Sequence, residues 1–409
     1  MKRIIVCMDG TWQSLNQPQL TNIGIIARSI AHKETRADGS EVHQTVIYTH
    51  GVGSSMGALA QRGFFESISY ALNRLFGGAF GEGLEDGILD TYLRLAFDYE
   101  EGDEIYIFGF SRGAFAARRL SGFINTAGIV SRRHTDKARE GFRLYYSAPG
   151  EDATDEQRRE HAEAAAKFRM DYGKGARNED GTRRATADVP PIKFLGVFDT
   201  VAQRGLAQVI ASITPWTETR RFSFVNQRIS KNVENARHAV AIDEARIGFP
   251  CSLWEDLDDD NKRVGRRAFE QRWFVGTHGD VGGGEKNTAL SAGALKWVAE
   301  GAAAAGLRFY ATYGDDESPL DAALRSAGFD SPISRPSFGK AIMPLNYPWR
   351  ARRIWRQKIK PTRVEAEFLL DESVFKRSGA EKLRPRYLPA SLRPFRTAFK
   401  DWLKDQHKQ

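Results

Sequence analysis

The sequence predicts an α/β fold with a mostly parallel sheet flanked by helices. Several short, continuous apolar runs are typical of strands buried on both faces: residues 4–8, 44–48, 104–108, 192–198 and 272–275. Other segments have helical spacing of their apolar residues: 62–77, 83–98, 112–127 and 287–305. Strands that alternate with helices favour parallel pairing, because each helix returns the chain to the same edge of the sheet.

The predicted strands end in loops rich in glycine or polar residues. These loops are Asp9-Gly10-Thr11-Trp12, His50-Gly51-Val52-Gly53, Gly109-Phe110-Ser111-Arg112-Gly113, Asp199-Thr200 and His278-Gly279-Asp280. In open α/β sheets, ligands bind beyond the carboxyl ends of the strands. We therefore expect the functional site to be assembled from these loops.

The pattern divides the chain into two parts. Residues 1–305 carry the alternating strands and helices and are expected to form a catalytic domain. Within them, 150–188 is highly charged and predicts a surface insertion, and 205–235 mixes apolar with basic residues and predicts a cap. Periodicity weakens over 306–409, which predicts an irregular C-terminal appendage.

Composition excludes several classes of protein. The chain has 409 residues, 41% of them hydrophobic, which is enough for a large core and excludes general disorder. The net charge of 60 − 52 = +8 is modest and does not identify a partner. Only two cysteines occur, Cys7 and Cys251, so no disulfide framework is expected.

The N-terminal apolar run is short, and Asp9 interrupts it, so it does not resemble a signal peptide. No apolar stretch approaches the roughly 18 residues of a membrane-spanning helix. We expect a cytoplasmic protein, with export possible only by a route that reads no N-terminal signal.

Ser111 is the predicted nucleophile. It follows the apolar run 104–108 and precedes a helical segment rich in small residues. A sharp turn between a strand and a helix, with flanking glycines, exposes a serine oxygen above the sheet, as in the nucleophile elbow of α/β-hydrolases. The alternative for the same context is a tight turn whose serine only caps the helix.

A serine nucleophile needs a base and an acid that orients the base. His278 is the predicted base, since it ends a strand and precedes a flexible glycine loop; His50 ranks second because it precedes the nucleophile in the chain. Asp199 is the predicted acid, with Asp280 and Asp243 as alternatives. Asp280 also has a structural interpretation, as the residue that shapes the glycine loop, and His238 is interpreted as structural.

The oxyanion formed during attack needs backbone donors. The amide of Arg112 follows the nucleophile and is the first predicted donor; Gly10 or Thr11 supplies the second. No cofactor is predicted.

The sequence also offers two mechanisms other than that of a serine hydrolase. Asp9-Gly10-Thr11 resembles part of an aspartate-phosphatase motif, but Cys7 occupies the position of its nucleophile. A metal-assisted hydrolase would use Asp9, His278 and Asp280. A hydrolase fold that lost its chemistry and serves as a binding module is the alternative outside enzymes.

Together these motifs resemble a known α/β-hydrolase family that includes the type VI secretion phospholipase effectors, the Tle1-like catalytic domain. The resemblance runs from Asp9-Gly10-Thr11-Trp12 to His278 with Asp280-Val281-Gly282-Gly283-Gly284. It implies a serine esterase or lipase with phospholipid substrates, and it places Ser111, Asp199 and His278 on the family's motifs. The chain departs from the family at Asp371-Glu372-Ser373-Val374, where relatives carry a histidine before Glu-Ser-Val.

Residues 347–363 are basic and aromatic, and they suggest a contact with a membrane. The segment has seven cations and no acids, with tryptophans interleaved. Cations attract anionic head groups, and tryptophan favours the membrane interface. The expected lipid contacts are Trp349, Arg352, Arg353, Trp355 and Arg356. The alternative is a solvated basic segment whose tryptophans pack on the core. No nucleic-acid-binding motif accompanies the charge, so nucleic acid is not an expected partner. The expected substrate is a lipid or another ester.

Overall fold

The computed structural model describes residues 1–10, 13–51, 80–150, 152–175, 187–201, 227–246, 249–310, 316–334, 360–380 and 387–406, with the short pieces 182, 184–185, 312–313, 352 and 354. Within these residues, seven strands form one sheet in the order β2-β3-β1-β4-β5-β6-β7. The strands are β1 (Arg3–Met8), β2 (Lys33–Thr35), β3 (Glu41–Thr49), β4 (Glu104–Phe110), β5 (Ile192–Phe198), β6 (Ala236–Ala241) and β7 (Phe269–Phe274). Neighbours pair in parallel, except for the antiparallel pair β2–β3, which confirms the predicted fold class.

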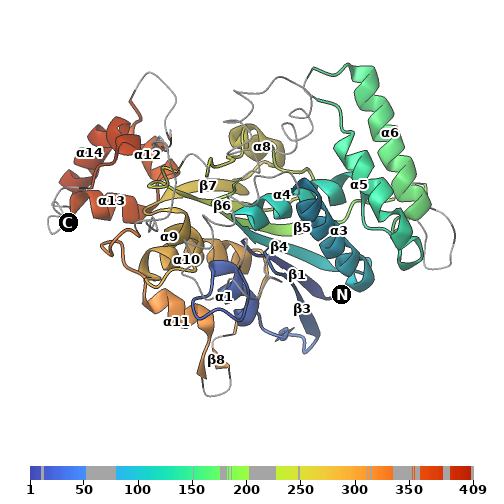
Figure 1. The fold of residues 1–409 in the computed structure, drawn as a ribbon, viewed down its shortest axis with the longest axis horizontal. Helices are drawn as coiled ribbons and strands as arrows, with labels where there is room; N and C mark the ends of the chain where they lie inside the picture. The colour runs from blue at the N-terminus through green and yellow to red at the C-terminus, as the bar shows by residue number, and fades with distance from the viewer. Residues whose placement is uncertain are drawn as a thin grey trace.

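Helices cover both faces of this sheet (Figure 1). One face packs against α3 (Phe80–Asp98), α4 (Arg112–Ala127) and α5 (Ala138–Tyr146), and the other against α1 (Asn22–Ser29) and α10 (Ala289–Ala304). Alternate residues of β1 divide between the two cores: Val6 packs toward α4, and Cys7 packs toward α10. From Ile4 to Met8 the strand is therefore apolar at every position, which is why the sequence shows a continuous apolar run there.

Three of the four predicted helical segments are found as α3, α4 and α10. The fourth, 62–77, lies outside the described residues. The other elements up to residue 325 are α6 (Asp155–Tyr172), α8 (Leu257–Val264), α9 (His278–Gly282), α11 (Pro319–Arg325), the short hairpin β8 (Thr312–Tyr313) with β9 (Asp316–Glu317), and the 3-10 segment η1 (Arg132–Lys137).

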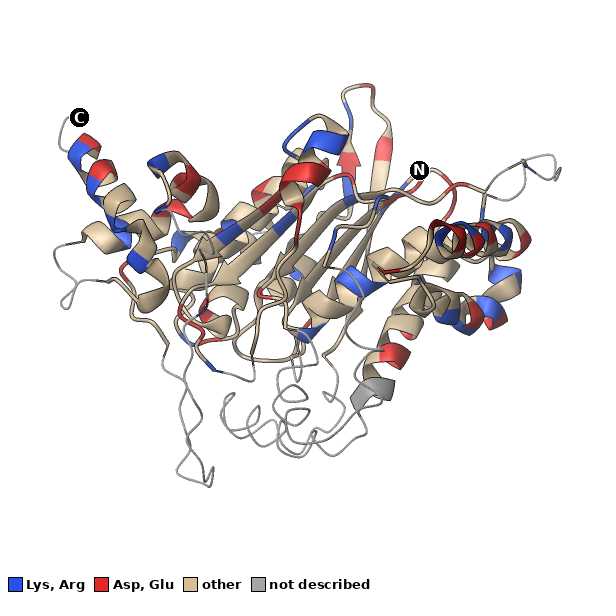
Figure 2. Cartoon of the chain, turned by 90° about the horizontal axis from the view of Figure 1, so that it is seen from above, with Lys and Arg blue, Asp and Glu red and all other residues tan. Residues whose placement is uncertain are grey.

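The charged segment at 150–188 contains α6. Thr154 begins this helix with a capping box: its side chain accepts from the Gln157 amide, and the Gln157 side chain accepts from the Thr154 amide. Ala165 and Phe168 are the buried residues of α6, and acidic and basic residues are interspersed along the rest of it, as the red and blue ribbon colours show (Figure 2). Most of the predicted cap at 205–235, namely residues 205–226, lies outside the described residues.

The C-terminal part contains short helices rather than wholly irregular chain: α12 (Arg363–Leu369), α13 (Glu372–Gly379), η3 (Ala390–Phe395) and α14 (Arg396–Gln406). Leu370 and Phe395 join a third core with Val240 and Trp273 of the sheet. The Asp371 amide donates to the Trp273 carbonyl at 2.9 Å. These four helical segments therefore pack along the β7 edge of the sheet (Figure 1). None of the helices in the described ranges combines the length and apolar character needed to cross a membrane.

Candidate active site

Ser111 occupies a strained turn between β4 and α4. Its backbone has φ 58° and ψ −120°, a conformation that costs free energy for any residue other than glycine. The flanking Gly113 permits the turn, because a Cβ atom there would lie 2.1 Å from the Met8 carbonyl oxygen of β1. The turn is thus pressed directly against the end of the neighbouring strand, as the nucleophile elbow requires.

Backbone hydrogen bonds connect this elbow to the loop after β5. The Ser111 amide donates to the Phe198 carbonyl at 3.1 Å, and the Val201 amide donates to the Ser111 carbonyl at 3.2 Å. Asp199 lies between these two partners. Ser111 and Asp199 are therefore held in neighbouring loops by main-chain geometry.

Asp199 and His278 form a buried pair. The Asp199 Oδ2 and His278 Nδ1 atoms are 2.6 Å apart, and the two residues are 0% and 3% exposed. The Asp199 backbone amide donates to the Ala239 carbonyl at 2.7 Å, and Asp199 Oδ1 accepts from the Ala241 amide at 3.0 Å. The carboxylate is consequently fixed against β6 and directed at the imidazole.

His278 is the first residue of α9, at the end of the loop after β7. A capping box between Thr277 and Asp280 defines the start of this helix. The His278 ring lies 4.6 Å from the Phe110 ring and 5.1 Å from the Phe249 ring, measured between centroids. Since Phe110 immediately precedes Ser111, the imidazole lies beside the elbow.

The alternative acids have other partners. The Asp280 carboxylate accepts from Thr277 and from Ser334, so it shapes the loop, as its structural interpretation predicted. Asp243 Oδ2 accepts from the Gly276 amide and from the Tyr387 hydroxyl, and burial raises the pKa of Asp243 to about 6. Asp199 is the carboxylate bonded to the His278 ring.

The other two histidines that the sequence singled out lie elsewhere. His50 is exposed after β3, against the edge of the Tyr48 ring. His238 is buried in β6 between Gln271 and the Thr200 amide, which donates to Nε2 at 3.2 Å. Burial lowers the pKa of His238 to about 3, so its neutral ring holds the backbone that follows Asp199.

The Gly10 prediction needs correction. Its amide donates to Asp9 Oδ1 at 2.7 Å and is therefore engaged within its own loop. Asp9 also accepts from the Thr21 and Tyr48 hydroxyls, and burial raises the pKa of Asp9 to about 6 despite these bonds. Arg112 begins α4 as expected, whereas Thr11 lies outside the described residues.

Arg352 corrects the lipid-contact prediction. Its guanidinium is buried and donates two hydrogen bonds to the Asp199 carboxylate, from Nη1 to Oδ1 at 2.5 Å and from Nη2 to Oδ2 at 3.0 Å. Burial alone would raise the pKa of Asp199, but the charge of Arg352 and the bond to His278 hold it far below its usual value. The other expected contacts, Trp349, Arg353, Trp355 and Arg356, lie outside the described residues.

The residues expected for a metal-assisted mechanism do not come together. Asp9, His278 and Asp280 hydrogen-bond to different partners, described above. In the described part of the chain, no three His, Cys, Asp or Glu side chains form a group suited to a metal ion.

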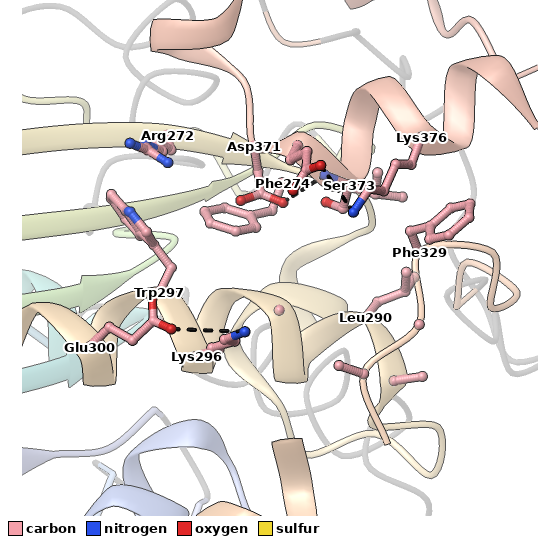
Figure 3. A pocket seen from close by; sticks show the side chains of 16 residues that line it. Arg272, Phe274, Leu290, Lys296, Trp297, Glu300, Phe329, Asp371, Ser373 and Lys376 are labelled. Carbon is pink, nitrogen blue, oxygen red and sulfur yellow. Dashed lines mark hydrogen bonds and ion pairs between the residues drawn. The ribbon is translucent and has the colours of Figure 1, made fainter. Parts of the chain in front are cut away.

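A cavity of about 380 Å³ lies apart from these residues, between α10 and α13 (Figure 3). Its lining mixes aromatic side chains such as Trp297 with both signs of charge, including the Lys296–Glu300 pair at 3.9 Å. Neither Ser111 nor the Asp199–His278 pair lines it.

A mostly parallel sheet, a serine elbow after β4 and an Asp–His pair after β5 and β7 define the α/β-hydrolase architecture. The chain belongs to the family described as "T6SS, Phospholipase effector Tle1-like, catalytic domain", whose model matches residues 2–301.

Three proteins with similarity to the chain are longer than it is. An uncharacterized protein of Saccharomyces cerevisiae, YEL023C, is 29% identical over 249 residues, which are 61% of this chain and 32% of that protein. A crystal structure of an uncharacterized protein from Pseudomonas aeruginosa has 17% identity and a TM-score of 0.37, covering 80% of this chain and 49% of that chain. The Tle1 effector bound to the VgrG spike of the type VI secretion system has 16% identity and a TM-score of 0.33, covering 70% and 53%. The chain thus spans about a third to half the length of these proteins.

Proposed function

We propose that this chain is a serine hydrolase that cleaves carboxylic esters of lipids, with phospholipids as the main class. The observation that carries the proposal is the 2.6 Å bond between Asp199 and His278, beside the strained Ser111 elbow. The family of Tle1-like phospholipase catalytic domains supports the lipid substrate.

In the proposed mechanism, the Ser111 hydroxyl attacks the ester carbonyl, and its proton passes to His278 Nε2. Asp199 accepts from Nδ1 and stabilises the imidazolium that forms. The negative oxygen of the tetrahedral intermediate accepts from the Arg112 amide at the start of α4.

The ester C–O bond then breaks, and the leaving alcohol takes the proton from His278, leaving an acyl group on Ser111. Water attacks this acyl-enzyme while His278 accepts a proton from it. Collapse releases the fatty acid and returns the proton to the serine oxygen.

The test is the release of free fatty acids from vesicles of mixed phospholipids, followed by mass spectrometry. Wild-type protein should release them, and Ser111→Ala should lower the rate by about 1000-fold or more. Ser121→Ala is a matched control, because Ser121 is a buried serine of α4, the helix that follows Ser111, and its hydroxyl donates to the Arg118 carbonyl. It should keep most of the activity.

Two results would contradict the proposal separately. Undiminished hydrolysis by folded Ser111→Ala protein would exclude Ser111 as the nucleophile. Wild-type protein that cleaves soluble esters but releases no fatty acid from vesicles would exclude the lipid class.

A further inference from the structure

We propose that Arg352 is a positioning residue for the Asp199–His278 pair, fixing the carboxylate with both guanidinium arms and keeping a positive charge beside the imidazole. This inference rests on the proposed function, because it assigns Arg352 a role in the same site. It also connects the C-terminal part of the chain to the chemistry of the elbow.

The Asp199 carboxylate has a full set of donors. Oδ1 accepts from the Ala241 amide at 3.0 Å and from Arg352 Nη1 at 2.5 Å. Oδ2 is bonded to His278 Nδ1 at 2.6 Å and to Arg352 Nη2 at 3.0 Å. An ionised carboxylate offers about four acceptor positions. All are therefore occupied, and rotation of Asp199 away from His278 would break several bonds at once.

Arg352 is itself fixed by the surrounding backbone. Nη1 also donates to the Ala241 carbonyl at 2.9 Å, and Nη2 donates to the Phe249 carbonyl at 2.8 Å. Its side chain is only 8% exposed. The planar fork is thus held between the end of β6 and the loop that contains Phe249, a geometry that lysine cannot reproduce.

The charge of Arg352 has a predictable effect on the base. An unshared Asp199 charge would strongly stabilise the His278 imidazolium, whereas Arg352 balances that charge and also repels the imidazolium. Loss of Arg352 would therefore leave the Asp199 charge unbalanced beside the imidazole, which favours the charged form of the ring.

Other titratable or charged groups surround the pair: Arg118, His238, Glu244 with its partner Arg246, Cys251, Asp280 and Glu285. Glu285 is the one that matters most for a pH profile, because it lies against Gly279 and burial raises its pKa to about 7. An experiment on Arg352 must separate its effect from the titration of Glu285.

The experiment measures kcat/KM for p-nitrophenyl butyrate as a function of pH for wild-type, Arg352→Gln and Arg352→Lys proteins, each also in a Glu285→Gln background. Arg352→Gln should move the acid limb of the profile upward by about one pH unit or more. Arg352→Lys keeps the charge and loses the fork, so it should leave the limb within about half a unit while lowering kcat/KM by about tenfold.

Arg377→Gln is the matched control. Arg377 is also a buried arginine of the C-terminal part, but its Nη1 donates to the Phe329 and Ser331 carbonyls rather than to a carboxylate. This variant should lose stability without moving the acid limb, which separates a role in positioning from a role in packing.

Titration of the His278 ring by NMR reads the same quantity without turnover, so it tests the inference even if the proposed function fails. The pH dependence of the His278 ring signals should differ between wild-type and Arg352→Gln protein. Superimposable profiles and midpoints for wild-type and Arg352→Gln would overturn the inference. If Arg352→Gln does not fold, Arg352→Lys decides: full wild-type kcat/KM in that variant would overturn it.

Discussion

Ser111 and Asp199 share a backbone feature that costs free energy. Both have positive φ, 58° and 35°, where side chains are disfavoured by about 1–3 kcal/mol each. Their own main-chain bonds, to Phe198 and Ala239, hold these conformations. The backbone strain is thus concentrated at the proposed nucleophile, Ser111, and at Asp199, the residue that orients the base.

The raised pKa of Asp9 predicts that its contribution to the free energy of unfolding depends on pH. Its folded pKa of about 6 exceeds the ordinary value of 3.8, so its contribution to stability is complete at low pH and is lost as pH rises through about 6. Asp9→Asn does not titrate. The stability of wild-type protein relative to this variant should therefore fall by up to about 3 kcal/mol between about pH 4 and pH 7.

Urea unfolding of both proteins at the two pH values measures this difference. A gap between wild-type and Asp9→Asn that stays constant with pH would show that Asp9 titrates normally in the folded protein.

Ser111, Asp199 and His278 could be predicted from the sequence because each follows a recognisable apolar run. Arg352 could not be found in this way. It is 153 positions from Asp199, within a basic aromatic segment whose cations favoured a surface interpretation. The charge of a side chain does not indicate whether it faces lipid or a buried carboxylate; that depends on the tertiary fold.

The Gly10 amide was misassigned for a local reason, since its neighbour Asp9 accepts its hydrogen bond.

At the scale of elements, the close approach of α4 to β1 sets the position of the elbow. A methyl group on Gly113 would collide with the Met8 and Asp9 carbonyl oxygens at 2.1 and 2.4 Å, and both are backbone atoms that cannot turn aside. Gly113→Ala should therefore lower the free energy of unfolding by more than about 2 kcal/mol and reduce ester hydrolysis further by displacing Ser111.

Gly293→Ala is the matched control for that prediction. Gly293 lies within α10, and a Cβ atom there meets nothing within 4 Å. Alanine should stabilise this helix by up to about 1 kcal/mol. Thermal unfolding and esterase assays of the two variants give the comparison, and equal stability of the two would contradict the close-packing account.

The strands most easily predicted were those with uninterrupted apolar sequence. β6 was harder, because Arg237 and His238 interrupt its apolar residues. Both polar side chains have specific partners: Arg237 bonds to the Trp297 carbonyl and His238 to Gln271. These partners are distant in sequence, so the local pattern could not indicate that the segment is a buried strand.

At the scale of the whole molecule, the C-terminal part completes the sheet's packing and the site. The family match ends at residue 301, yet Arg352 lies beyond it and bonds to Asp199. Weak periodicity predicted an irregular appendage, because helices such as α12 and α13 have only seven and eight residues. Helices this short are stabilised by tertiary packing more than by their own sequence.

That packing can be tested at Phe395, which is 0% exposed in the third core. Phe395→Ala should lower the free energy of unfolding by about 3–5 kcal/mol. Phe97→Ala is the control, because Phe97 is 54% exposed and should cost little. Denaturant unfolding measures both. A small effect at Phe395 would mean that the C-terminal part contributes little to the stability of the folded protein.

Covalent labelling with diisopropyl fluorophosphate, followed by intact mass measurement and peptide mapping, tests directly whether Ser111 is an activated nucleophile. We expect one adduct, on Ser111, that is lost when the protein is unfolded first and forms much more slowly in His278→Ala protein. Labelling confined to another residue, or no labelling of folded protein that still hydrolyses esters, would contradict it.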